Sequence, residues 1–183
     1  MRILRCVAGG SVLLIVIACA DNRGASGLLA PTRSFAEHSS AAERSPAHRV
    51  QASGSFAAII DPSTFTFTPR GRNCLVTVKG QLVFSGTIQG TAFGETKALE
   101  FAPCSQVVAA PPGTYPDVFH SRAVFDGTVA GVPAHANLWY MGRTAAGGHI
   151  DGRFVFSNGV AGRLDVSAQV AVGGSYSGAL VVN

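Results

Sequence analysis

Three histidines are the residues whose type and spacing could most directly form a metal site in this chain. His120, His135 and His149 are separated by 15 and 14 residues, and neighbouring antiparallel strands could bring such side chains together around a zinc ion. His120 follows Phe119 and His149 precedes Ile150, so each is expected to face away from the apolar side of its segment. We therefore predict surface or strand-end histidines, and we assign no metal site and no cofactor.

The serines and carboxylates form no arrangement that a familiar catalytic mechanism requires. The chain contains no Gly-x-Ser-x-Gly sequence of the kind that exposes a nucleophilic serine at a sharp turn. Glu95 and Glu100 fall on opposite faces of an alternating segment, which does not suit a pair of acid–base carboxylates. Asp151 and Asp165 are expected on a solvated face beside arginines. We assign no catalytic residue, and the sequence favours a non-enzymatic role while leaving enzyme activity open.

The N-terminal residues predict export and lipid attachment. An uncharged, mostly apolar stretch of 15 residues, Cys6–Ala20, is shorter than the about 20 residues that a membrane-spanning helix needs. Within it, the segment Val16–Cys19 (VIAC) resembles the lipobox of bacterial lipoproteins. The resemblance implies cleavage of a signal peptide, residues 1–18, and acylation of Cys19, which would hold the mature chain at a membrane. An ordinary secretory signal and a transmembrane anchor are the alternatives.

The residues after this segment bear on localisation. Ala20 follows the cysteine, and under the sorting rule of enteric bacteria the absence of Asp at this position indicates the outer membrane. We therefore expect an exported protein, lipid-anchored in the bacterial cell envelope on the periplasmic side of the outer membrane or at the cell surface. Residues 19–49 are rich in small polar residues and poor in apolar ones, which predicts a flexible tether.

The composition of the chain excludes several classes of protein. Its 47% hydrophobic and 13% charged residues argue against a disordered chain, and its 22 glycines lack the three-residue period of collagen. Removing residues 1–18 takes away Arg2 and Arg5 and leaves 12 basic and 10 acidic residues. The resulting net charge of +2, scattered along the chain, is too weak to predict a nucleic-acid partner.

Two of the four cysteines predict a disulfide. Cys6 belongs to the predicted signal peptide and Cys19 to the predicted lipid site, which leaves Cys74 and Cys104 in the exported domain. An oxidising compartment favours their pairing, and closing a loop of about 30 residues would contribute roughly 3–4 kcal/mol of stability. Two buried thiols or a metal-binding pair are the alternatives, and the latter lacks nearby ligands.

From Val50 onward the side chains alternate between apolar and polar, as in strands with one buried face. The clearest run is Arg163–Val172, with its apolar residues from Leu164 to Val172 on one face. The turn signals are Asn158-Gly159, typical of a type I′ hairpin, and Gly173-Gly174. The predicted strands, some of them halves of one bent strand, are 50–60, 64–68, 74–80, 82–92, 96–101, 119–130, 133–142, 148–157, 160–172 and 175–182.

These strands predict the fold class of residues 50–183. Regularly spaced strands without helical periodicity indicate an all-β fold, a small antiparallel meander barrel of about eight strands. A barrel of this size can hold one small ligand. The proline-rich segment 103–116 predicts an exposed loop over the barrel mouth. Trp139 and Tyr140 must point to opposite faces of one strand, so one of them could line a cavity.

The rhythm of glycine and aromatic residues resembles a known family of barrels. The segments Phe84–Gly90, Phe125–Gly131, Gly159–Gly162 and Gly174–Gly178 look like the strands of allene oxide cyclase-like barrels, over residues 80–181. The resemblance implies an apolar interior able to hold a fatty-acid-like or phenolic molecule. No motif in this chain matches the acidic and water-holding residues of the plant enzymes, so the resemblance assigns no active-site residue.

Three functions are consistent with these features. The first is a membrane-tethered envelope lipoprotein whose barrel binds a small apolar ligand or serves a structural role. The second is a cyclase- or isomerase-type enzyme that uses a shaped cavity. The third is a protein-interaction module with a filled barrel. An apolar pocket near the roughly 300 Å³ typical of ligand sites would favour the first two, and a structure without such a pocket would leave the third. The ligand and the oligomeric state are not predicted.

Overall fold

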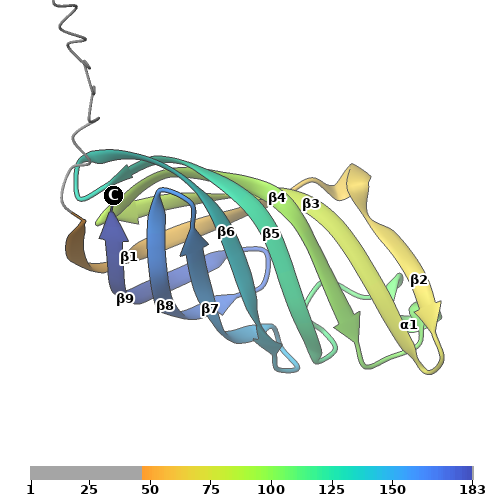
Figure 1. The fold of residues 1–183 in the computed structure, drawn as a ribbon. Helices are drawn as coiled ribbons and strands as arrows, with labels where there is room; N and C mark the ends of the chain where they lie inside the picture. Colours follow the sequence, from red (N-terminus) through yellow and green to blue (C-terminus); the bar gives the residue numbers. More distant parts are fainter. Residues whose placement is uncertain (1–46, 183) are drawn as a thin grey trace, which may run out of the picture. The chain divides into compact units, whose positions relative to one another are not determined.

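Nine strands run through the part of the chain that the computed structural model describes, residues 47–182 (Figure 1). Pairing of β1 with β3 closes eight antiparallel strands, all except β2, into a barrel, which confirms the predicted fold class. The predicted signal peptide, Cys19 and most of the predicted tether lie outside the described residues, as does Asn183. The strands are β1 (His48–Ile60), β2 (Thr66–Arg70), β3 (Asn73–Gly86), β4 (Ile88–Glu100), β5 (Asp117–Val129), β6 (Val132–Thr144), β7 (His149–Ser157), β8 (Val160–Gln169) and β9 (Gly173–Val182).

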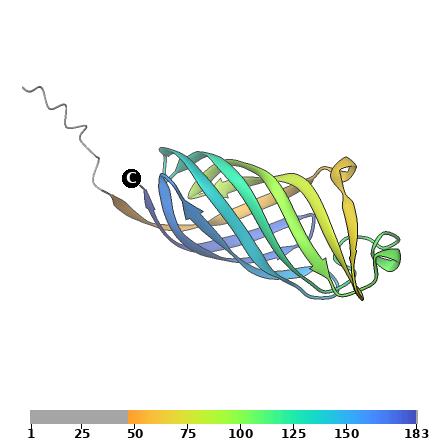
Figure 2. The same ribbon diagram turned by 45° about the vertical axis from the view of Figure 1, so that its right-hand side comes forward.

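Two strands change partners along their length, and this closes the barrel. β1 pairs with β9 over His48–Ala57 and with β3 over Gly54–Ile60. β3 pairs with β2 over Asn73–Thr77 and with β1 over Gly80–Gly86. The other strands pair in chain order, so the tilted wall seen in Figure 2 is a meander.

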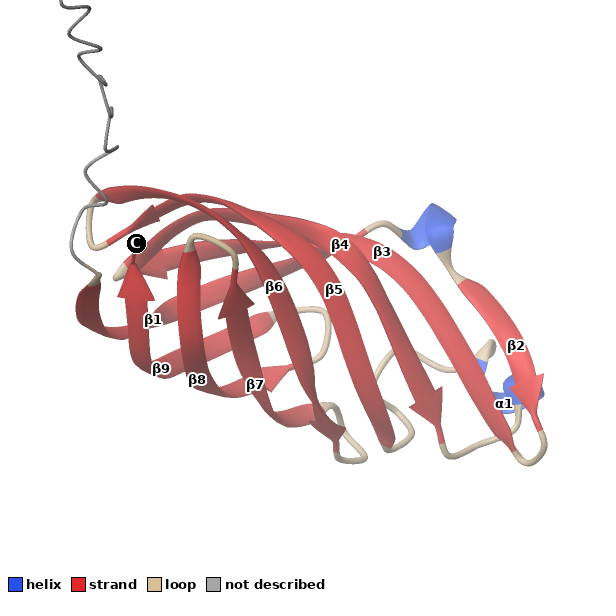
Figure 3. Cartoon of the chain, in the orientation of Figure 1, coloured by secondary structure: helices blue, strands red, loops and turns tan. Residues whose placement is uncertain are grey.

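The two ends of the barrel are built differently. At one end, which we call the hairpin end, tight turns such as Asn158-Gly159 join successive strands. At the other, the loop end, residues 101–116 connect β4 to β5 and contain the helical turn α1 (Cys104–Val107). The second helical turn, η1 (Pro62–Thr64), leads into β2 on this side of the barrel (Figure 3). Within residues 47–182 no helix has the length and apolarity to cross a membrane.

One predicted strand, 82–92, is wrong. β3 ends at Gly86 and β4 begins at Ile88, so the segment contains a hairpin turn. Phe84 and Ile88 are both buried in the core. Even-numbered side chains therefore face inward on both sides of the turn, and the sequence pattern gives no sign of it. The segments predicted on either side of Gln81 and of Gly94 are parts of single longer strands, because β3 and β4 continue through these positions. The remaining predicted strand ends lie within three residues of the observed ones.

The two predicted turn signals have different outcomes. Asn158 and Gly159 have φ values of 63° and 89°, as a type I′ turn requires. The turn predicted at Gly173-Gly174 lies earlier, with Ala171 at a φ of 59°, and both glycines belong to β9. Val172 sits in this turn and is 64% exposed, so its predicted place on the buried face is wrong.

Large apolar side chains fill the half of the barrel near the hairpin end. The ring of Phe125 is fully buried and meets Phe84 and Phe156 edge-on, at centroid distances of 5.8 and 5.7 Å. Edge-to-face packing of this kind is favourable beyond simple burial. The other large apolar side chains that are almost fully buried are Phe154, Ile88, Leu138, Leu164, Leu180, Val129 and Val160.

Tyr176 ties β9 to the turn between β3 and β4, across β1. Its hydroxyl donates a hydrogen bond to the backbone oxygen of Ser85 and accepts one from the backbone N–H of Ile88, both at 3.0 Å. Gly54 on β1 leaves room for the hydroxyl, because a Cβ there would lie 2.5 Å from it. The buried hydroxyl therefore has the partners that burial requires.

The predicted disulfide between Cys74 and Cys104 is confirmed. The bond spans 30 residues with a Cα–Cα distance of 4.7 Å, and it fastens α1 to the beginning of β3. Around it lies a small second core formed by Val76, Ala102 and Val107. The bond anchors the connection between β4 and β5 at the loop end.

Candidate functional site

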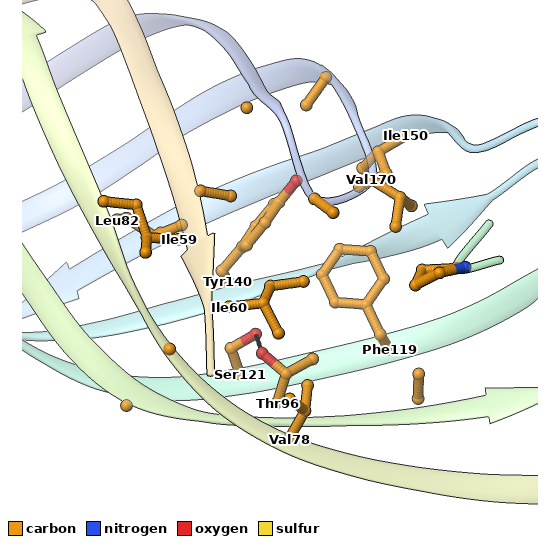
Figure 4. Close-up of a pocket in the computed structure, with 18 of the residues that line it drawn as sticks. Ile59, Ile60, Val78, Leu82, Thr96, Phe119, Ser121, Tyr140, Ile150 and Val170 are labelled. Carbon is orange, nitrogen blue, oxygen red and sulfur yellow. Dashed lines mark hydrogen bonds between the residues drawn. The ribbon is translucent and has the colours of Figure 1, made fainter. Parts of the chain in front are cut away.

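An apolar cavity of about 160 Å³ occupies the half of the barrel near the loop end (Figure 4). The volume falls short of the roughly 300 Å³ expected for a ligand site from the sequence analysis, so the structure does not support a drug-sized ligand. It is close to the 150 Å³ of an engineered cavity that binds benzene. A single ring or a short chain fits this volume, whereas a whole fatty-acid-like molecule does not. Every barrel strand contributes to the wall, including the side chains of Ile60, Val78, Leu82, Phe119, Ile150 and Val170.

The cavity exists because small residues face inward in this half. Between Ala92 and Ala98, β4 turns only alanine, glycine and threonine toward the interior. Glycines on β6 and β7 also leave space for the neighbouring rings. A Cβ at Gly142 would lie 3.2 Å from the Phe119 ring, and one at Gly152 would lie 3.1 Å from the Tyr140 ring. Two aromatic rings can therefore lie close to the wall beside an open space.

A row of polar side chains crosses the wall near the mouth of the cavity. Glu100 on β4 lies opposite Asp117 on β5, which lies opposite Thr144 on β6. Asp117 is only 7% exposed, and its Oδ1 accepts a hydrogen bond of 2.9 Å from the Thr144 hydroxyl. All three line the cavity. Two carboxyl groups thus share the mouth of a largely apolar space.

Burial raises the pKa of both carboxyl groups. The pKa of Asp117 rises to about 6, because its desolvation outweighs the hydrogen bond from Thr144. The pKa of Glu100 rises to about 7 through desolvation and the neighbouring charge of Asp117. Among residues 47–182, neither group takes part in an ion pair. Both groups therefore change charge close to neutral pH, as acid–base or cation-binding carboxyls do.

A second polar row lies deeper and contains a hydroxyl without a partner. Thr96 and Ser121 hydrogen-bond to each other at 2.7 Å. The Tyr140 hydroxyl is buried and has no hydrogen-bond partner among the described residues. Its ring packs against Phe119 and Phe154, at centroid distances of 4.8 and 4.7 Å. Figure 4 shows the hydroxyl turned away from the Thr96–Ser121 pair.

The unpartnered hydroxyl has an energetic consequence. Burial and the charge of Asp117 raise the pKa of Tyr140 above its usual value, so the phenol stays protonated. A buried polar group without a hydrogen bond costs about 1–3 kcal/mol. A molecule in the cavity that bonds to this hydroxyl would recover that free energy. Tyr140 therefore offers a specific contact in a wall that is otherwise mostly apolar.

The proline-rich loop reaches the cavity, as predicted. Pro112 and Gly113 contribute to its lining. The loop is held by a hydrogen bond of 2.9 Å from the Gly147 N–H to the Gly113 oxygen, which connects it to the β6–β7 turn. Gly113 has a φ of 84°, and a Cβ there would lie 2.8 Å from the Gly148 Cα. A glycine is therefore needed where the two loops touch.

His120 and His149 face away from the apolar side of their strands, as the alternation predicts, whereas the alternation gave no orientation for His135. His120, His135 and His149 are exposed. His149 Nε2 lies 3.4 Å from an oxygen of Asp151, and His135 Nδ1 lies 4.0 Å from an oxygen of Asp126. Over residues 47–182, no group of three or more His, Cys, Asp or Glu side chains is placed to hold a metal ion.

Trp139 and Tyr140 point to opposite faces, as predicted. Tyr140 lines the cavity. The indole of Trp139 lies instead beneath the guanidinium of Arg122, 4.5 Å from its ring centre. The sequence thus indicated that one of the two could line a cavity, but it did not indicate which.

Sequence reasoning missed the pairing of Glu100 with Asp117. It compared Glu100 with Glu95 on the same strand, whereas the relevant partner lies across the 101–116 loop. A usable signal was present, because residues that flank the connection between two antiparallel strands tend to lie opposite each other. The hydrogen bond of 3.0 Å from the Phe101 N–H to the Pro116 oxygen closes that connection and sets the two carboxyls side by side.

Comparison with known proteins adds no family assignment. No family model matches the chain, and no curated protein is significantly similar to it. The resemblance to allene oxide cyclase-like barrels accordingly stays a prediction, and the geometry of the cavity becomes the main guide to function.

Proposed function

We propose that this protein binds a small apolar molecule in the loop half of its barrel, and that lipid on Cys19 tethers it in the bacterial cell envelope. The observation that carries the first part is an apolar cavity of about 160 Å³ lined by Tyr140, whose hydroxyl has no hydrogen-bond partner within residues 47–182. Burying one aromatic ring there would remove apolar surface from water, at about 25 cal/mol per Å². A bond to the hydroxyl would set the orientation of the ligand.

Filling the cavity tests the binding proposal. Ala98 lines the cavity on β4, so Ala98→Leu should occupy the space and weaken the binding of benzene or phenol by about tenfold or more. Titrations followed by NMR, with resonances of Phe119 and Tyr140 as reporters, would measure this. Ala161→Leu makes the same change on the exposed outer face of β8 and should leave affinity unchanged. Equal affinity in the Ala98 variant would contradict the proposal.

Lipid attachment is tested separately at the two N-terminal cysteines. The wild type and Cys6→Ser should both yield a mature chain that begins with an acylated Cys19 and partitions with membranes. Cys19→Ser should lose the acyl mass and the membrane association. Mass spectrometry of the mature N-terminus together with fractionation measures both properties. A wild-type chain without acyl mass would refute the tether and leave the binding proposal intact.

An isomerase- or cyclase-type enzyme is the second candidate, favoured by one observation. Glu100 and Asp117 exchange protons near neutral pH at the mouth of the cavity, as general acids and bases must. Native mass spectrometry of the exported protein would identify a co-purified molecule. Catalysis predicts that the wild type converts this molecule to an isomer and that Glu100→Gln does not. Release of the unchanged molecule by both would leave binding as the function.

A further inference from the structure

We propose that the cavity selects small apolar molecules that carry a protonated amine, with the apolar part inside the barrel and the ammonium group between Glu100 and Asp117. This inference rests on the proposed binding function and specifies the chemical class of the ligand. It depends on three features: the paired carboxyls, the apolar space beneath them and the unpartnered Tyr140 hydroxyl.

The two carboxyls form a negative site that lacks a counter-ion in the described part of the chain. Directly opposed residues on antiparallel strands have Cβ atoms about 4.5–5.5 Å apart, and like charges at that distance repel each other. Glu100 and Asp117 are opposed in this way and face the interior. An ammonium group between them would relieve the repulsion and bond to acceptors of which Asp117 is buried and Glu100 partly buried.

The other charged groups around the cavity do not fill this role. The titratable residues of its lining are Lys79 on β3, Glu100 on β4, Asp117 on β5 and Tyr140 on β6. The remaining strands and the loop contribute only uncharged side chains to the lining. Lys79 is exposed, and its charge acts on Asp61 instead. The cavity therefore presents two acidic groups without a basic partner from its own wall.

The deeper wall is also suited to an amine with an apolar body. The Phe119 and Tyr140 rings stand edge to face beside the space, at a centroid distance of 4.8 Å (Figure 4). An aromatic group in the cavity could pack against these rings, and such aromatic contacts are favourable beyond simple burial. The Tyr140 hydroxyl has a free acceptor lone pair and a free proton among the described contacts. The rings and the hydroxyl would therefore hold the apolar body of the ligand, while the two carboxyls at the mouth select the ammonium group.

The proposal predicts how affinity depends on pH. Glu100 and Asp117 have pKa values raised to about 7 and about 6, so both lose their protons between about pH 5 and pH 8. Only the deprotonated pair attracts an ammonium group. Affinity for an amine should therefore increase as the pH rises through this range, whereas affinity for a neutral analogue should not increase.

The experiment compares benzylamine with benzyl alcohol, which have the same ring and differ in the charged group. Isothermal titration of the exported, oxidised protein at pH 8 should show benzylamine binding at least about tenfold more tightly. Glu100→Gln and Asp117→Asn should each remove most of this preference and its increase with pH. Asp165→Asn, which neutralises an exposed carboxylate on the outside of β8, should retain both.

Each outcome of the comparison has a defined meaning. Equal affinities, or tighter binding of the alcohol at pH 8, would overturn the inference while the binding function stands. Failure of both probes and of benzene to bind would overturn the binding function and the inference together. Circular dichroism confirms that each variant is folded. The Asn side chain at 117 can still accept the hydrogen bond from Thr144, so this variant keeps the local geometry.

Discussion

The hairpin half and the loop half of this barrel share the same strands but have different interiors. In the hairpin half, Phe84, Phe125 and Phe156 interlock, and the one buried tyrosine there, Tyr176, has hydrogen-bond partners. In the loop half, small residues, two carboxyls and the unpartnered Tyr140 surround a cavity. The comparison indicates that one half provides stability and that the other contains unfavourable groups, as the proposed binding site would require.

The largest expected difference lies between two phenylalanines on β5. Phe125→Ala should destabilise the protein by about 3–5 kcal/mol, because it empties a fully packed site. Phe119→Ala enlarges an existing cavity and should destabilise it by clearly less than Phe125→Ala. Urea unfolding followed by circular dichroism measures both free energies. Equal losses would show that the two halves contribute similarly to stability.

The disulfide provides the next largest effect. Replacing Cys74 and Cys104 together by Ala should lower the free energy of unfolding by about 3–4 kcal/mol, the amount expected for closing a loop of this length. Hydrogen exchange should increase first in β2, α1 and the beginning of β3. Uniform loss of protection through the hairpin half would contradict the division between the two halves.

The two buried tyrosines should respond to the same substitution with opposite signs. Tyr176→Phe removes a hydroxyl with two close partners and leaves the Ile88 N–H unsatisfied, which should cost about 1–3 kcal/mol. Tyr140→Phe removes an unpartnered hydroxyl and should be neutral or stabilise the protein by up to about 1 kcal/mol. Thermal unfolding of the two variants, without ligand, measures the contrast. A loss of similar size in both would imply a partner for Tyr140.

The smallest expected effect concerns the pH dependence of stability. The pKa values of Glu100 and Asp117 are higher in the folded protein than their ordinary values of 4.5 and 3.8. The folded state therefore binds more protons than the unfolded chain between about pH 4 and pH 7, and stability falls as the pH rises through this window. With allowance for solvent screening of Glu100, Glu100→Gln should stabilise the protein by about 1–2 kcal/mol at pH 8. No increase in stability is expected at pH 4. An equal increase in stability at both pH values would show that the charge of Glu100 does not cause the effect.

The filled half could largely be predicted from the sequence. Alternation places Leu164 and Val166 in the core, and Asn158-Gly159 specifies its turn through local backbone preference. The disulfide followed from counting the cysteines that remain outside the predicted signal peptide and the predicted lipid site. The alternation did not predict the turn between Gly86 and Ile88, because every second residue continues to face the core on both sides of the turn.

The candidate site was harder to predict because it depends on register. Glu100 and Asp117 are 17 residues apart, and only the pairing of β4 with β5 makes them neighbours. The free volume is likewise a property of several strands together, since each contributes residues that look unremarkable alone. The alternation of the strand identified Tyr140 as a candidate for the cavity wall. The lack of a hydrogen-bond partner for its hydroxyl depends on the packing of Phe119 and Phe154 around the ring.

The pairing of β1 with β9 also bears on chain connectivity. His48 pairs with Val182, so the hydrogen-bonded wall continues without interruption across the first and last strands. A short linker between these two residues would make the barrel a covalent ring, and new ends could be opened within residues 108–111 of the loop. Such a circular permutant would preserve every strand pairing but would free the loop that reaches the cavity. Comparing its ligand binding with that of the wild type would show whether the loop controls entry to the proposed site.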